Sequence, residues 1–90
     1  MDESGAQPTR DLAQAARQKL STLNEREHAL LVWLTHGHSL VEIAHKLNTS
    51  FEAAARLKAL TMRKLGVQYT AEAVRIGILA GIDHDVSVEE

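Results

Sequence analysis

The chain has 90 residues, of which 44% are hydrophobic and only 3% aromatic, and its formal net charge is −2. This length suffices for one small domain with a single aliphatic core. The absence of cysteine excludes disulfides and thiolate-ligated zinc. No apolar run approaches the roughly 18 residues of a membrane-spanning helix, and no signal-peptide pattern opens the chain, so we expect a cytoplasmic protein without membrane partners.

The N-terminal region is predicted to contain a disordered segment and one helix. Residues 1–8, MDESGAQP, are small, polar and acidic, which is typical of disorder. A domain is predicted over residues 9–82, and its first helix runs from Arg10 to Leu20 with Thr9 as its N-cap. The narrow apolar stripe of this helix consists of Leu12, Ala13, Ala16 and Leu20.

Two capping boxes predict the next two helices, over residues 24–36 and 40–47. Asn24 is followed three residues later by Glu27, and Ser39 is followed at the same spacing by Glu42. Gly37 is expected to end the first of these helices, and Asn48 suits a left-handed exit from the second. The residues predicted to face inward are Leu30, Leu31, Trp33, Leu34, Leu40, Ile43, Ala44 and Leu47.

A longer helix is predicted over residues 51–65, between an N-cap at Ser50 and a stop at Gly66. Its predicted inward row is Ala54, Leu57, Thr61 and Leu65. Residues 51–66 carry four basic side chains against one acidic side chain, which makes this the most basic segment of the chain. A nucleic-acid contact is therefore sought here.

The last predicted helix covers residues 71–80, with Thr70 as N-cap and Gly81 as its stop. Its apolar residues lie on more than one side, which predicts self-association in addition to core packing. The predicted homodimer seam is Val74, Ile78, Leu79 and Ile82. The acidic tail, residues 83–90, is expected to fray.

The sequence does not predict an enzyme, a cofactor or a metal site. His36 and His38 flank a glycine in an interhelical turn, but no third ligand accompanies them. Glu27 and Glu42 are explained as capping residues rather than as acid–base carboxylates. No glycine-rich phosphate loop is present. The predicted fold is therefore an all-α bundle of small helices containing a helix-turn-helix.

One family shares many of these features at the expected spacings. The matching residues are Leu23, Arg26, Glu27, Leu34, Gly37, Ser39, Glu42, Ile43, Ala44, Leu47, Ser50, Lys64, Leu65, Gly66, Val67, Ala73, Val74 and Gly81. On these residues, the segment 23–81 resembles the LuxR-type helix-turn-helix domain of bacterial response regulators. The resemblance implies four family helices preceded here by an extra one, with residues 51–65 in the DNA major groove and the last helix at a dimer contact. No receiver or ligand-binding segment precedes the domain, so we expect a stand-alone member or a fragment of one.

The expected recognition helix departs from the family pattern. The family usually has Thr-Val-Lys-x-His where this chain has residues 53–57, AAARL, so that Ala55 replaces a lysine that commonly reaches DNA. Ala59 stands at a second common contact position. Arg56 is the main candidate for reading base edges, and the remaining basic residues are assigned to phosphates. The predicted contacts to double-stranded DNA are Ala55, Arg56, Lys58, Ala59, Arg63 and Lys64.

Two function hypotheses follow, together with one structural alternative. The first is a dimeric DNA-binding transcriptional regulator of reduced DNA affinity. The second is a protein-interaction module on the same fold, which would bind a protein partner through an apolar row. That row consists of Phe51, Ala55, Ala59 and Leu60. The structural alternative is that the row packs against residues 9–20, which would block the recognition helix.

Overall fold

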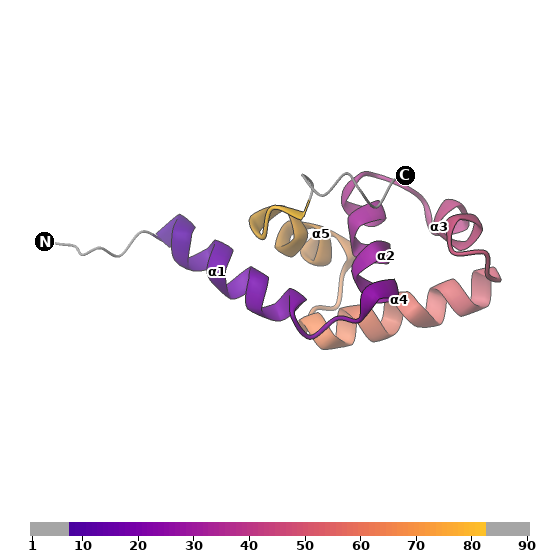
Figure 1. Ribbon diagram of the computed structural model, residues 1–90, viewed down its shortest axis with the longest axis horizontal. Coiled ribbons are helices and arrows are strands. Elements are labelled where there is room, and N and C mark those ends of the chain that lie inside the picture. The colour runs from indigo at the N-terminus through magenta and orange to yellow at the C-terminus, as the bar shows by residue number, and fades with distance from the viewer. Residues whose placement is uncertain (1–7, 83–90) are drawn as a thin grey trace, which may run out of the picture.

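Five helices make up residues 8–82, the part of the chain that the computed structural model describes (Figure 1). They are α1 (Pro8–Leu20), α2 (Glu25–Thr35), α3 (Leu40–Lys46), α4 (Phe51–Leu65) and α5 (Thr70–Leu79). No strand occurs in this range, so the predicted all-α class is confirmed. Of the segment predicted to be disordered, residues 1–8, the structure describes only Pro8, which begins α1, so the prediction is wrong at this residue. The predicted disorder of residues 1–7 and the fraying of residues 83–90 lie outside the described residues.

Three of the predicted N-caps form as expected. The side-chain oxygens of Asn24, Ser39 and Ser50 accept hydrogen bonds from the backbone N–H three residues later, at 2.8, 3.2 and 3.0 Å. Glu27 and Glu42 complete the first two as capping boxes by accepting the cap residue's own N–H. Each cap satisfies donors that the first helical turn leaves without intrahelical partners.

The other two predicted caps are wrong. Thr9 lies inside α1, which begins at Pro8, a residue whose missing N–H costs nothing at the first helical position. Thr70 is the first residue of α5, and Tyr69 precedes the helix. The Tyr69 backbone N–H instead donates to Glu72 Oε1 at 3.0 Å, so a carboxylate inside the first turn caps this helix.

The predicted helix exits are confirmed by backbone geometry. Gly37, Gly66 and Gly81 have φ values of 90°, 74° and 82°, and Asn48 has a φ of 56°. These left-handed conformations cost little for glycine and are tolerated by asparagine. They end the helices and set the short turns between them.

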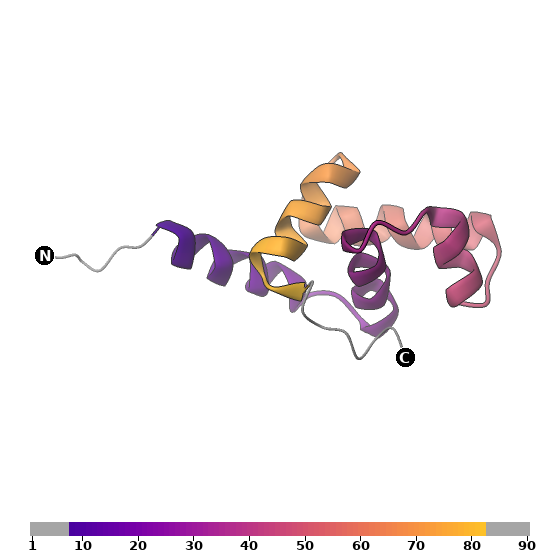
Figure 2. The same cartoon turned by 90° about the horizontal axis from the view of Figure 1, so that it is seen from above.

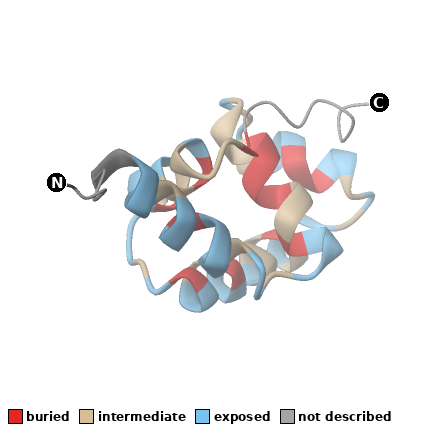
Figure 3. Ribbon diagram, turned by 60° about the vertical axis from the view of Figure 1, so that its left-hand side comes forward, coloured by how far each residue is buried: buried red, intermediate tan, exposed pale blue. Residues whose placement is uncertain are grey.

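Helix α2 lies at the centre of the domain because it is apolar around most of its circumference. Four consecutive residues, 30–33, are all buried. On one side of α2, Leu31 and Val32 belong to a cluster completed by α4, α5 and Ile82. On the other side, Leu30 and Trp33 pack with Ile43 of α3. The buried residues thus lie where helices face one another, and the exposed ones lie outside (Figure 3).

Helix α1 packs against α5 and touches only the C-terminal end of α4. Ala16 is buried, and Leu20 packs against the cluster that contains Leu65. Lys19 Nζ donates to the Leu65 carbonyl at 3.5 Å, a favourable place for a cation at a helix C-terminus. Leu12, at the start of the predicted apolar stripe, is 48% exposed, so the stripe is not buried along its whole length. Both ribbon views show why, because the first half of α1 extends away from the other helices (Figures 1 and 2).

Candidate nucleic-acid interface

Helices α3 and α4 are joined by a four-residue turn, 47–50, and form a helix-turn-helix unit. The Thr49 backbone N–H donates to the Ala44 carbonyl at 3.0 Å, and the positive φ of Asn48 reverses the chain. Ala44 is 5% exposed, and its small side chain lets the two helices approach. Leu57 of α4 packs against the core cluster that contains Ile43 of α3, so the unit shares the core of the domain.

The inner side of α4 is fixed by three fully buried residues, Ala54, Thr61 and Leu65. Thr61 brings a hydroxyl into the core, and this hydroxyl donates to the Leu57 carbonyl at 2.8 Å. Because the hydrogen bond is made within the helix, burial leaves no donor unsatisfied. Three of the four residues predicted to face inward are therefore buried, and Leu57 is partly buried.

The opposite side of α4 is open to solvent. Arg56, Ala59, Leu60 and Arg63 are all exposed, and we call these four residues the outer strip. Ala55, at the margin of the strip, and Lys58, nearer the inner side of the helix, are partly buried. The strip follows from helix geometry, because positions 56, 59, 60 and 63 lie within about one-third of the circumference.

The outer strip is not covered by α1. Phe51 is 51% exposed and Leu60 is 46% exposed, and α1 reaches only the far end of α4, at Leu65. The alternative in which the apolar row packs against residues 9–20 is therefore wrong. The apolar and basic side chains of α4 face solvent together.

Lys64, predicted to contact a phosphate, pairs with a carboxylate of the protein itself. Its Nζ lies 2.8 Å from Glu27 Oε1, which also accepts the Asn24 backbone N–H at 2.8 Å. Burial favours a raised pKa for Glu27, but the hydrogen bonds from Lys64 and Asn24 and the positive charge of Lys64 together hold that pKa below its usual value. The buried carboxylate has Lys64 as its counter-charge, so this lysine is not an unpaired cation on the surface of α4.

The predicted dimer seam on α5 also needs one correction. Ile78 is 53% exposed and Val74 and Leu79 are partly buried, but Ile82 is only 4% exposed. The chain reverses at Gly81 and returns Ile82 to the first core cluster. The outward side of α5 is thus free for a partner without Ile82.

The structure adds residues that the sequence did not single out. A shallow hollow of about 400 Å³ lies beside the outer strip, where Ala59 and Arg63 meet Met62, Val67 and Gln68. The absence of a long side chain at position 59 helps to open this hollow. Its position was not predictable because Val67 and Gln68 belong to the turn after α4, whose path depends on tertiary packing.

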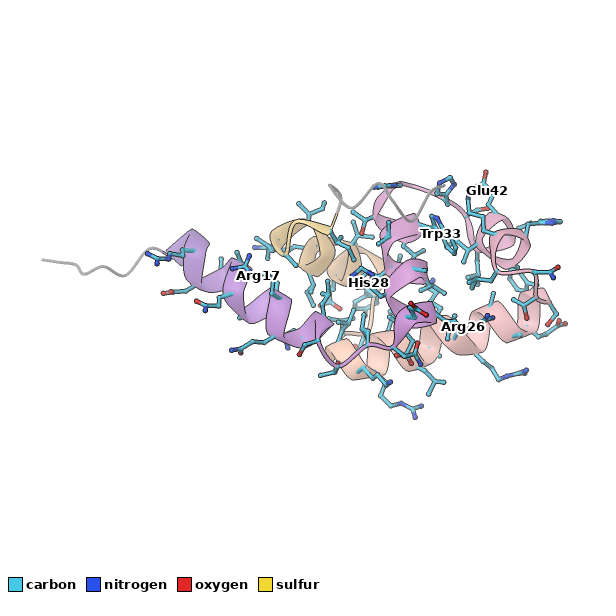
Figure 4. All side chains as sticks on the ribbon, viewed as in Figure 1. Arg17, Arg26, His28, Trp33 and Glu42 are labelled. Carbon is cyan, nitrogen blue, oxygen red and sulfur yellow. The ribbon has the colours of Figure 1, made fainter. Side chains whose placement is uncertain are left out.

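A larger hollow of about 510 Å³ lies between α1, α2 and the end of α5. Leu20 and Ile82 contribute apolar surface to it, and Arg17 and His28 are its basic side chains. Figure 4 labels both basic residues, on α1 and on α2 respectively. No residue of α4 lines this hollow, so it is separate from the candidate interface.

The turn between α2 and α3, which contains His38, is held by contacts with the first turn of α3. His38 Nδ1 lies 3.6 Å from Glu42 Oε1, which also accepts the Ser39 backbone N–H at 2.7 Å. This backbone hydrogen bond is the main cause of the lowered pKa of Glu42. Across residues 8–82, no group of three or more histidine, cysteine or acidic side chains is arranged to hold a metal ion.

Within the described part of the chain, none of the helices combines the length and the hydropathy required to cross a bilayer. No protein-family model, curated protein or solved structure matches the chain.

Proposed function

We propose that the protein is a transcriptional regulator that binds double-stranded DNA by placing α4 in the major groove. The observation that carries this proposal is the open face of α4, on which Arg56 and Arg63 are both exposed. An α-helix fits the major groove, and arginine is the side chain that most often reads guanine there. Helix α3 and the turn before α4 complete the helix-turn-helix unit that the LuxR-type resemblance implies.

The basic residues of α4 divide into one reader and a small set of backbone contacts. Arg56 lies in the middle of the helix and is the candidate for a bidentate contact to guanine. Arg63 and Lys58 are the candidates for phosphate contacts. Lys64 is not included among them because it forms an ion pair with Glu27. Two phosphate contacts per domain predict a shallow salt dependence, with a log–log slope of about −2. The expected affinity is low compared with proteins that make many such contacts.

The proposal is tested by selecting DNA fragments from a random library at low salt and titrating the best binder at two salt concentrations. Replacing Arg56 with alanine should cost about 1–3 kcal/mol at one base position, because one base contact is lost. Arg63→Ala should weaken all sequences alike and flatten the salt slope. Arg10→Ala is the matched control, since this exposed arginine lies on α1. Enrichment of no sequence, or equal loss with the control, would refute the proposal.

A second function is supported by the apolar side chains on the same helix. Phe51 and Leu60 are each about half exposed, and Ala55 and Ala59 follow Phe51 at intervals of four residues, an apolar row that suits a partner helix better than a phosphate backbone. The double variant Ala55→Lys/Ala59→Lys separates the two functions. If α4 binds a protein, the variant should weaken that partner and strengthen DNA binding. If it abolishes sequence-specific DNA binding, the alanines contact the groove and the interaction-module hypothesis fails.

A further inference from the structure

The middle of the outer strip is apolar and is enclosed by arginines along the helix axis. Arg56 and Arg63 are seven residues apart, which on an ideal helix places them on nearly the same line, about 20° apart. Ala59 and Leu60 lie between them, one on each side of that line. All four residues are exposed, so this arrangement faces whatever α4 binds.

The chemistry of these two central residues restricts what they can recognise in DNA. Neither Ala59 nor Leu60 carries a hydrogen-bond donor or acceptor in its side chain. The major-groove edges of the base pairs offer donors, acceptors and one apolar group, the C5-methyl of thymine. An apolar side chain that faces the groove therefore gains contact only where a thymine methyl meets it. Next to any other base-edge group it removes water from a polar atom without replacing the lost hydrogen bond, which weakens binding.

The surroundings of Ala59 strengthen this restriction. Met62 and Val67 line the hollow beside Ala59, so apolar surface continues from the outer strip toward the end of α4. The polar side chains of the hollow are Arg63 and Gln68. The methyl group of a thymine fits such a surface, whereas a phosphate would find Arg63 as its only cationic partner and the Gln68 amide as its only other side-chain donor there.

We propose, on the basis of the DNA-binding function above, that Ala59 and Leu60 read thymine C5-methyl groups next to a guanine bound by Arg56. Seven residues of helix span about 10.5 Å, and stacked base pairs are about 3.4 Å apart. Arg56 and Arg63 thus reach points about three base steps apart. The half-site is then a guanine followed by A·T pairs whose thymines face α4, with Arg63 on the flanking backbone.

The test replaces thymine with uracil, which removes the C5-methyl and leaves the hydrogen-bonding edges unchanged. The selected DNA is prepared with uracil at one A·T position at a time, and its dissociation constant is compared with that of the thymine form. Each methyl in contact should change the constant about fourfold, which is the transfer free energy of one buried methylene, about 0.8 kcal/mol, converted to a ratio.

The protein variants show which side chain meets the methyl. Leu60→Ala should remove most of the uracil effect at one position. Leu12→Ala is the matched control, since Leu12 is 48% exposed and lies on α1 whereas Leu60 is 46% exposed on α4. The control variant should keep the full uracil effect. Leu60 is a surface residue, and a circular dichroism spectrum verifies that the variant remains folded.

The outcomes separate this inference from the proposed function. If the selection enriches a sequence but uracil binds as tightly as thymine at every position, methyl reading is wrong and DNA binding stands. If the uracil effect persists unchanged in Leu60→Ala and in Ala59→Ser, other residues read the methyls and the assignment is wrong. If no sequence is enriched, the proposed function itself fails, and this inference fails with it.

Discussion

Among the polar side chains of the domain, Glu27 is the one whose replacement we expect to lower the folding stability most. Its carboxylate is 3% exposed and joins two elements, because Oε1 accepts the Asn24 backbone N–H at the start of α2 and Lys64 Nζ from the last turn of α4. Glu27→Ala removes both contacts. The Asn24 N–H then loses its acceptor, and the C-terminal end of α4 loses a tie to α2.

The magnitude follows from the two contacts taken separately. A hydrogen bond from a backbone N–H to a charged acceptor contributes about 1.5–3 kcal/mol, and removing the acceptor leaves the donor unpaired. The Lys64 side chain is 40% exposed, so water replaces part of its interaction and the ion pair adds about 1 kcal/mol or less. Together, Glu27→Ala should lower the free energy of unfolding by about 2–3 kcal/mol.

The chain offers a matched control and a built-in probe. Glu42 occupies the same capping-box position in α3, but its side chain is 59% exposed and has no lysine partner. Glu42→Ala should therefore cost much less. Trp33 is the only tryptophan and is 7% exposed, so its fluorescence reports unfolding in urea. The midpoints and slopes of the urea transitions give the free energies of the variants.

A double-mutant cycle identifies the partner. In the Glu27→Ala background, Lys64→Met should be nearly neutral, whereas in the wild-type background it should be destabilising. If Glu27→Ala costs no more than Glu42→Ala, or if the two losses add fully, the buried pair does not stabilise the domain and the argument is refuted.

Three further predictions concern pH, packing and assembly. The pKa of Glu27 is lowered below its ordinary value of 4.5 in the folded state, so the contribution of this carboxylate is complete above that value and is lost as pH falls through the folded-state pKa. Acidification should therefore reduce the urea midpoint of wild type more than that of Glu27→Gln. Gly77→Ala should destabilise by about 1 kcal/mol net in the same assay, because overpacking outweighs the gain in helix propensity. The new Cβ would lie 2.7 Å from Thr35 Oγ1 and 2.8 Å from Ile82 Cγ2, and a urea midpoint at or above that of wild type would show that the site relaxes freely. Ile78→Asp should abolish the proposed α5 homodimer in sedimentation, and a wild-type protein that stays monomeric at high concentration would contradict the dimer itself.

The helix boundaries were predictable because their signals are local. Capping side chains and glycines act within three or four residues, so Asn24, Ser39 and Gly66 could be interpreted without knowledge of the fold. The prediction that Thr70 caps the last helix was also made from a local signal, since threonine before an apolar run is often an N-cap, but it was wrong. Here a carboxylate from within the helix, Glu72, satisfies the backbone donors instead.

The errors at the candidate surfaces arose from long-range contacts. A lysine in the last turn of a basic helix looks like a phosphate ligand, and only the buried position of Glu27, 37 residues earlier, shows where Lys64 is directed. Ile82 continues the apolar spacing of α5, but the reversal at Gly81 turns it into the core. The exposed positions of Arg56 and Leu60 were predicted correctly because the inward row at 54, 57, 61 and 65 fixes the orientation of α4.

The placement of α1 limits what can cover the apolar end of α4. Lys19 anchors the end of α1 to Leu65, the last residue of α4, and α1 packs against α5. Phe51 lies at the opposite end of α4, fourteen residues away, which is about 21 Å along a helix. Helix α1, tied to the far end of α4, cannot turn back over Phe51 without leaving Ala16 unburied. Helix α1 therefore covers neither Phe51 nor the outer strip, and both stay available to a ligand in the described part of the chain.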